Sequence, residues 1–194
     1  MSENHKVIRL VDLLETEGGE LFYSNLAANF YSRNKDVERF LKEKAVQSTK
    51  LCTSSTYLVV SKANPNDLLG YFSLATKMLT LKKISLSKSL ERVISRYGYY
   101  DEDSDSYKIP AILIAQLGKN FNEDSASISG SDLLAIALRQ VSVILSFSSG
   151  KTVFLECERK QKLIDFYNAN GFILLDNKVI SKDSKELTQM YRLV

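Results

Sequence analysis

The chain has 194 residues, of which 44% are hydrophobic and 25% are charged. This length suits one domain with a sizeable core, and the composition excludes a largely disordered chain. The net charge of +3 is smaller than a dedicated nucleic-acid binder carries, although it permits an anionic partner such as a nucleotide cofactor or RNA.

Cysteine usage and the N-terminus bear on the cellular compartment. Cys52 and Cys157 match no metal-binding or disulfide spacing, which favours a reduced compartment. The polar N-terminus lacks the apolar core of a signal peptide, and no run approaches the roughly 20 apolar residues of a membrane span. We therefore expect a cytoplasmic protein without a membrane partner. His5 is the one histidine and lies in a terminal tail, so we expect neither a metal site nor Cys–His catalysis.

The first part of the chain predicts a strand, one or two helices and a hairpin. Residues 7–11 read as a strand, and apolar side chains between residues 26 and 45 recur at helical spacing. Asn34 or Asp36 is a suitable N-cap for the second helix. Residues 56–61 and 68–80 predict two strands, joined by a turn rich in Asn, Pro and Asp.

The segment 82–108 predicts a helix that is followed by an acidic run at residues 101–105. The acidic run is read as a solvated loop in preference to a metal site, because it lacks the glycine and the closing glutamate of a calcium loop. Basic residues in or near the helix could follow a phosphate backbone or simply form a solvated surface. These residues are Lys77, Lys82, Lys83, Lys88, Arg92 and Arg96.

The rest of the chain alternates strands and helices. Residues 109–117 are nearly continuous in apolar character, as expected of a central strand covered on both faces. A helix over 131–145, a strand over 152–156, a helix from Lys160 and two final strands follow. A mixed α/β sheet with helices on both faces satisfies this order.

The end of the last helix carries the clearest functional pattern, the sequence from Asp165 to Phe172. Gly171 suits the residue after a helix because glycine enters positive φ freely. Tyr167, in the last turn, is thereby held beside a strand, where a phenol can donate a proton to a departing thiolate, as acyl transfer from a thioester requires. The alternative is a core tyrosine that only packs its ring.

This order of elements, with these motifs, resembles the GCN5-related N-acetyltransferase superfamily over nearly the whole chain. Residues 109–118 are similar to the fourth strand of the acetyltransferase toxins of bacterial toxin–antitoxin systems, and residues 36–41 and the pair Phe166-Tyr167 are also similar to that group. The resemblance implies one acetyltransferase domain over 1–194 with an insertion at about 82–108. It also implies a mostly antiparallel central sheet.

The resemblance further implies a site for acetyl-CoA. In the superfamily the central strand splays from its neighbour, and backbone groups here at Leu117, Gly118 and Lys119 would pair with the pantetheine arm. The pyrophosphate would lie at the start of the next helix, where backbone N–H groups and the helix dipole favour an anion. Two departures from the superfamily signature occur there, since Ser125 replaces Gln or Arg and Ile128 replaces the first glycine. The remaining residues that the resemblance assigns to the cofactor are Ser127, Ser129, Gly130, Ser131 and Asn168.

By the same resemblance Tyr167 would be the general acid toward coenzyme A, and a primary amine would attack the thioester directly. The central strand carries no acidic residue that could serve as the base. Glu156 and Glu158 are the nearest candidates, and the alternative for both is a solvated charge at a strand end. Arg159, Lys160 and Lys162 either attract cofactor phosphates or form the solvated start of the helix.

We therefore expect an acetyl-CoA-dependent N-acetyltransferase. Its acceptor would be a primary amine, and the resemblance to toxins points to the amino group of an aminoacyl-tRNA, with an antitoxin and a homodimer as further partners. The alternative is a non-catalytic relative that binds an acyl-CoA or a protein, and the altered glycine loop motivates it. A third hypothesis, an RNA-binding module without chemistry, is disfavoured by the modest charge.

Overall fold

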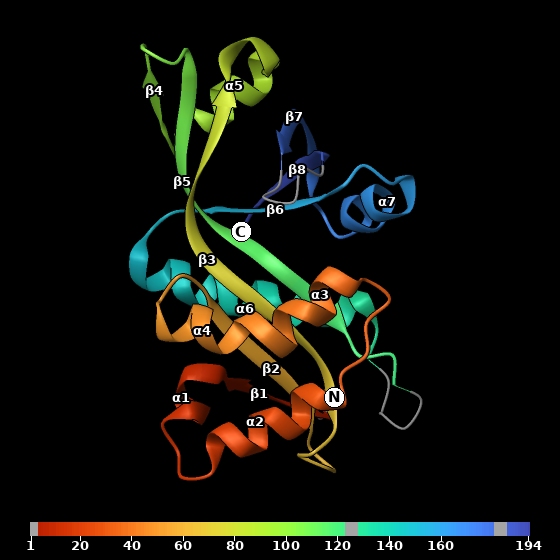
Figure 1. Cartoon of the computed structure of the whole chain (residues 1–194). Coiled ribbons are helices and arrows are strands. Elements are labelled where there is room, and N and C mark those ends of the chain that lie inside the picture. Colours follow the sequence, from red (N-terminus) through yellow and green to blue (C-terminus); the bar gives the residue numbers. More distant parts are fainter. Residues whose placement is uncertain (1–3, 123–127, 181–185) are drawn as a thin grey trace. The chain divides into compact units, whose positions relative to one another are not determined.

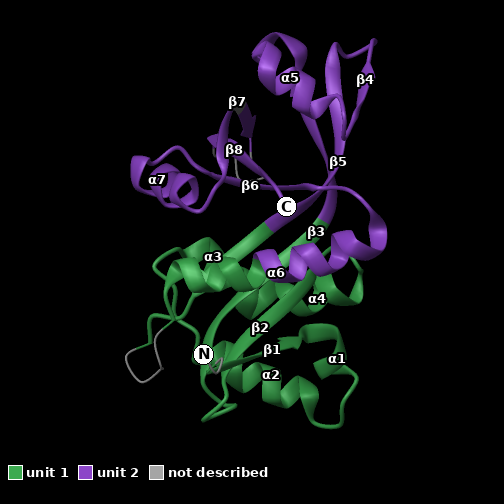
Figure 2. Cartoon of the chain, turned by 180° about the vertical axis from the view of Figure 1, so that it is seen from behind, with its two compact units in different colours: residues 1–75, 115–137 green, residues 76–114, 138–194 purple. Residues whose placement is uncertain are grey.

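The computed structural model describes residues 4–122, 128–180 and 186–194 (Figure 1). The chain forms two compact units (Figure 2): unit 1 contains residues 1–75 and 115–137, and unit 2 contains residues 76–114 and 138–194. Three elements run through both units, namely β3 (Leu68–Lys82), β5 (Ser106–Lys119) and α6 (Gly130–Ser148).

Unit 1 begins with an antiparallel sheet and a set of short helices. β1 pairs with β2, and β2 pairs with the first part of β3. The predicted strand at 7–11 is confirmed with a small shift, because the chain turns into a helix at Leu10. The elements of unit 1 are β1 (His5–Arg9), α1 (Leu10–Leu14), α2 (Gly19–Ala28), α3 (Lys35–Arg39), the π-helical turn η1 (Phe40–Lys44), α4 (Ala45–Lys50) and β2 (Ser55–Ser61).

The helices of unit 1 cover both faces of its sheet. Apolar side chains of α1, α2, η1 and α4 form one core with Leu58, Val60 and Tyr71 of the sheet. The predicted cap is confirmed, since the Asn34 side chain accepts a hydrogen bond from the Asp36 N–H at 3.0 Å. On the opposite face α6 packs closely: a Cβ added to Gly70 of β3 would lie 3.0 Å from the Leu133 side chain.

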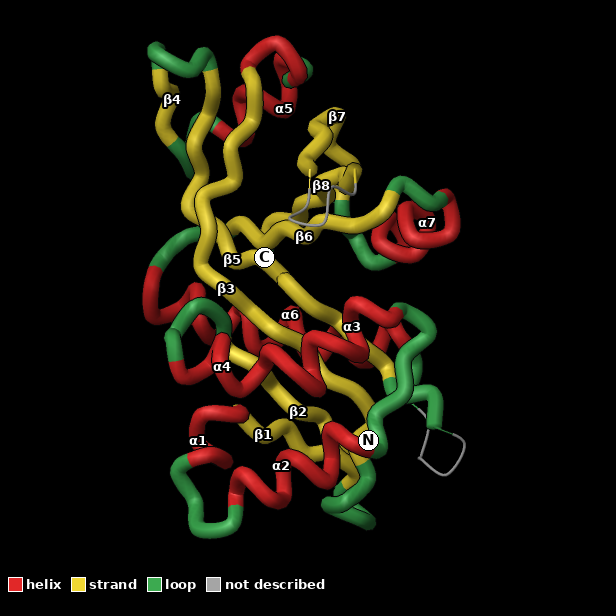
Figure 3. Tube along the Cα trace, in the orientation of Figure 1, coloured by secondary structure: helices red, strands yellow, loops and turns green. Residues whose placement is uncertain are grey.

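Unit 2 contains the rest of the sheet (Figure 2), and Figure 3 shows the strands in yellow. β5 pairs in parallel with β6, and the remaining pairs are antiparallel: β4 with β5, β6 with β8, and β7 with β8. The last strand therefore lies between β6 and β7. The further elements of unit 2 are the 3-10 turn η2 (Lys83–Ser85), α5 (Lys88–Ile94), β4 (Tyr99–Asp101), β6 (Thr152–Glu158), α7 (Gln161–Ala169), β7 (Ile173–Ile180) and β8 (Glu186–Leu193).

Hydrogen-bonded neighbours give the strand order β1-β2-β3-β5-β6-β8-β7, with β4 beside β5. The prediction of a mixed, mostly antiparallel sheet with helices is confirmed. The segment 82–108 contains η2, α5 and β4, and its Ile94 and Tyr107 are buried in one cluster with Leu79 of β3 and Ile109 of β5. Its acidic run begins in β4, where Asp101 pairs with Lys108 and accepts a hydrogen bond from Ser104 at 2.6 Å.

α6 is long and apolar enough, by length and composition alone, to cross a membrane. This differs from the expectation that no apolar run approaches the length of a membrane span. The same test is passed by core helices of globular proteins, and Leu133, Leu134, Ala137 and Val141 of α6 are buried in the described structure. This spacing is that of an amphipathic helix with one face in a core.

Candidate active site

The residues predicted to form the site fall into two groups. Leu117, Gly118 and Lys119 at the end of β5, and residues 129–131 at the start of α6, belong to unit 1. Tyr167 and Asn168 of α7 belong to unit 2. Ser125 and Ser127 lie outside the described residues.

The turn after α7 fixes the position of Tyr167 through a Schellman motif. The Phe172 N–H donates to the Tyr167 carbonyl at 3.0 Å, and the Gly171 N–H donates to the Asn168 carbonyl at 2.9 Å. Gly171 has a φ of +79°, which confirms the conformation predicted for it. The Arg192 guanidinium closes the turn by donating to the Asn170 carbonyl at 2.7 Å. Asn168, exposed in the last helical turn, supplies its backbone carbonyl to this motif.

The Tyr167 ring is held between two aromatic side chains. Its centroid lies 5.0 Å from that of Phe166 and 5.8 Å from that of Phe172, both in edge-on arrangements. Within the described residues the hydroxyl makes no hydrogen bond. Burial raises the pKa of the Tyr167 phenol well above its ordinary value, and the nearby Cys157 raises this pKa further. The phenol therefore keeps its proton at neutral pH, as a general acid must.

The two glutamates considered as bases are both engaged. Glu156 accepts a hydrogen bond from the Gln189 side chain of β8 at 2.8 Å. Glu158 pairs with Lys160 at 2.5 Å, and the Lys160 N–H also donates to the Glu158 carbonyl. These contacts tie both carboxylates into the strand end and the start of α7.

The end of β5 continues beyond its parallel neighbour. The ladder between β5 and β6 consists of three residue pairs and ends at Ile114 and Leu155, whereas β5 runs on to Lys119. Within unit 1 this extension lies against β3, since the Asn120 N–H donates to the Leu69 carbonyl at 2.9 Å.

Gly118 is required by close packing in unit 1. A Cβ at this position would lie 2.6 Å from the Val37 side chain, 2.8 Å from the Tyr71 ring and 3.1 Å from the Phe30 ring. α3 can therefore pack directly against the backbone of β5, the strand that is predicted to bind the cofactor.

The first turn of α6 is capped by its own side chains. The Asp132 N–H donates to the Ser129 hydroxyl oxygen at 3.0 Å, and that hydroxyl donates to the Asp132 carboxylate at 2.6 Å. Ser129 is therefore the N-cap of α6, and Asp132 is the third helical residue, whose carboxylate holds the capping hydroxyl. Ser129 is thus engaged as an N-cap, and a carboxylate stands in the turn where a pyrophosphate was predicted.

A cluster that the sequence analysis missed lies just beyond β5. Asn120 is buried, and its side-chain amide donates to the Leu68 carbonyl at 2.8 Å and accepts from the Tyr31 N–H at 3.0 Å. It thereby joins the loop after α2 to the strand end. Two cations meet at the neighbouring Phe121 ring: Arg33 Cζ lies 4.4 Å and Lys119 Nζ 5.3 Å from its centroid.

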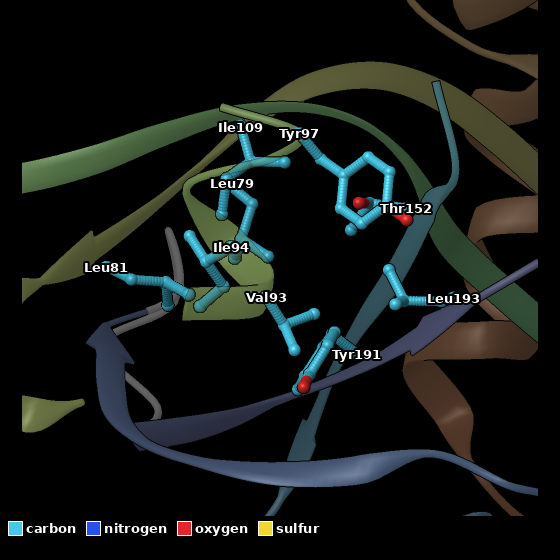
Figure 4. Close-up of a pocket in the computed structure, with 9 residues that line it drawn as sticks. All are labelled: Leu79, Leu81, Val93, Ile94, Tyr97, Ile109, Thr152, Tyr191 and Leu193. Atoms are coloured by element: carbon cyan, nitrogen blue, oxygen red, sulfur yellow. The ribbon is translucent and has the colours of Figure 1, made fainter. Parts of the chain in front are cut away.

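Unit 2 contains a small cavity and an open groove among its described residues. A cavity of about 10 Å³, enough for one water, lies between α5 and the strands and is lined mainly by apolar side chains such as Leu79, Ile94 and Tyr191 (Figure 4). An open groove of about 770 Å³ lies at the turn after α7, where Gly171, Ile173 and Arg192 line it. Tyr167 lines neither hollow. Among the described residues no group of three His, Cys, Asp or Glu side chains could hold a metal ion.

The described elements and the Tyr167 turn define an α/β fold of the acyltransferase type, as the sequence resemblance implied. Among solved structures the chain is similar to KacT, in a tyrosine-to-phenylalanine mutant, with 20% identity, coverage of 96% of this chain and 94% of that one, and a TM-score of 0.66. It is also similar to AtaT complexed with acetyl-methionyl-tRNAfMet, with 18% identity, 95% and 93% coverage and a TM-score of 0.63.

A third similar structure is an AtaT mutant toxin bound to acetyl-CoA and the C-terminus of the antitoxin AtaR, with 14% identity, 98% and 94% coverage and a TM-score of 0.62. No family model matches the sequence, and no match was found among the curated proteins. At these identities the similarity establishes the fold.

Proposed function

We propose that this protein is an acetyl-CoA-dependent N-acetyltransferase that acts on a primary amine. The observation that carries the proposal is Tyr167: a phenol fixed by a Schellman turn and two rings, with a raised pKa and no hydrogen-bond partner in the described part of the chain. The shared fold with AtaT, which binds acetyl-CoA, supports it.

The residues present fit the acyl-CoA in part. β5 extends beyond its ladder with β6, so Leu117 and Gly118 would offer backbone groups of the kind that pair with the amides of a pantetheine arm. Gly130 and Ser131, the first two residues of α6, are both small. Ser129 and Asp132 fit less well, because the hydroxyl is already engaged and the carboxylate would repel a phosphate.

When bound, acetyl-CoA supplies an acetyl thioester. In the proposed mechanism the acceptor amine would attack the thioester directly, and Tyr167 would donate its proton to the sulfur as the C–S bond breaks. The proton that the amine nitrogen loses as the amide forms would restore the phenol. The amine must arrive without its extra proton, and Glu156 and Glu158 are the proposed routes for that proton through water. Their contacts with Gln189 and Lys160 would hold both carboxylates in place.

For the acceptor we propose the amino group of an aminoacyl-tRNA, because AtaT has been solved with acetyl-methionyl-tRNAfMet. An antitoxin is the corresponding partner, as AtaT has been solved with AtaR. A cytoplasmic location follows from such a substrate.

The test is acetyl transfer from labelled acetyl-CoA to a panel of amines that includes charged tRNA, using the wild type and Tyr167→Phe. We expect Tyr167→Phe to lower kcat by about 10² to 10⁴-fold while acetyl-CoA affinity is unchanged. Phe166→Leu is a matched control that alters the ring contact and keeps the phenol. No transfer by the wild type to any amine, with acetyl-CoA still bound, would favour the non-catalytic acyl-CoA-binding alternative.

A further inference from the structure

The cluster around Phe121 brings two positive charges to one ring at the end of β5. Arg33 comes from the loop between α2 and α3, and Lys119 is the last residue of β5. Each cation gains from the ring face. Together they make the end of β5 a place where an anion is favoured.

Arg33 differs from the other cation of its loop. Lys35 lies over the Tyr31 ring at 4.6 Å and also pairs with Glu38 at 3.2 Å. Arg33 is exposed and pairs with no carboxylate in the described structure. Its guanidinium therefore keeps donors available in a planar arrangement that suits phosphate oxygens.

The cluster is held in place by backbone and side-chain bonds. The Phe121 N–H donates to the Tyr31 carbonyl at 2.9 Å, and the buried Asn120 side chain accepts from the Tyr31 N–H. The same amide oxygen accepts from the Asn122 N–H at 3.0 Å. These hydrogen bonds fix the loop that carries Arg33 to the end of β5.

The start of α6 offers little positive charge to a phosphate. Ser125 stands where the superfamily signature has Gln or Arg, and Asp132 places a carboxylate in the first helical turn. A ligand arm running along Leu117 and Gly118 would reach Lys119 at the strand end. We propose that Arg33, with Lys119, binds the phosphates of the acyl-CoA cofactor and compensates for the altered loop. This inference rests on the proposed function.

The test is calorimetric titration of the wild type and Arg33→Gln with two ligands, acetyl-CoA and acetyl-pantetheine, which has the same thioester and arm but no phosphate. We expect Arg33→Gln to weaken acetyl-CoA binding about tenfold and to leave acetyl-pantetheine binding unchanged. The wild-type affinity for acetyl-CoA should also fall more steeply with salt than that of the variant. Lys35→Gln is the matched control, because it also removes a cation but one that is already paired with Glu38. It should change neither affinity. Thermal unfolding checks that the exposed substitutions preserve the fold.

Several outcomes would overturn the inference. Equal acetyl-CoA affinity in the wild type and Arg33→Gln would do so, as would an equal loss for both ligands, which indicates a general structural effect. A variant that loses affinity for tRNA but keeps it for acetyl-CoA would assign the cations to RNA phosphates instead. If the wild type binds no acetyl-CoA at all, both the proposed function and the inference fail. If the wild type binds acetyl-CoA and Arg33→Gln binds it equally well, only the inference fails.

Discussion

At the residue scale, Glu38 shows how a single carboxylate organises the loop that carries Arg33. It accepts the Ser32 N–H at 3.0 Å and pairs with Lys35 at 3.2 Å and Lys42 at 3.3 Å. The Ser32 hydrogen bond, with help from the two lysines, lowers the pKa of Glu38 to about 2. The sequence offered Asn34 or Asp36 as the cap but did not predict this role of Glu38, because the role depends on the loop folding back onto α3.

Glu38 therefore gives a pH prediction. Its folded pKa lies below the ordinary value of 4.5, so its contribution to stability is complete above about pH 4.5 and is lost as the pH falls toward 2. We expect Glu38→Gln to lower the free energy of unfolding by about 1–2 kcal/mol at pH 7. Urea unfolding measured from pH 7 to pH 3 should show the two proteins converging at acid pH. A constant difference across that range would contradict this account.

At the scale of elements, a tyrosine of β3 fastens α3 to the sheet of unit 1, and a tyrosine of α2 fastens η1 to α2. The Tyr71 hydroxyl donates to the Val37 carbonyl at 2.6 Å, and the Tyr23 hydroxyl donates to the Leu41 carbonyl. In a π-helical turn the backbone bonds depart from the α pattern, and side-chain donors can serve its carbonyls. Val37 then lies against Gly118 of β5.

Gly118→Ala tests that contact. The added methyl would meet Val37 at 2.6 Å and Tyr71 at 2.8 Å, so we expect a loss of about 1–3 kcal/mol in unfolding free energy. The double variant Gly118→Ala with Val37→Ala relieves part of the clash and should lose less than the sum of the single variants. Strict additivity of the two losses in denaturant unfolding would show that the methyl meets no such obstacle.

Gly171→Ala tests the turn that positions Tyr167. There is room for a Cβ, since the nearest atom belongs to Arg192 at 3.5 Å, so the cost is that of a φ of +79°. We expect a loss of about 1 kcal/mol in unfolding free energy and a smaller loss for Gly171→Asn, because asparagine tolerates this conformation better. If asparagine proved as costly as alanine in thermal unfolding, backbone conformation would not be the cause.

At the scale of the whole molecule, the sequence predicted local elements better than their assembly. Periodicity and turn residues identified the 56–80 hairpin and the helix before Gly171, because these signals are local. The position of β8 between β6 and β7 depends on pairing between distant segments, which periodicity does not encode. Ser129 was predicted both as a helix cap and as a phosphate ligand; the structure shows the cap, and the contact of its hydroxyl with Asp132 was not predicted. Arg33 and Phe121 are too far apart in the chain for any spacing to join them.

The central claim is that this protein binds and uses acetyl-CoA, and calorimetric titration of the wild type with acetyl-CoA tests it most directly. We expect saturable binding of acetyl-CoA in the micromolar range. Absence of binding at millimolar acetyl-CoA would contradict the account and would leave a protein that has the fold without the cofactor.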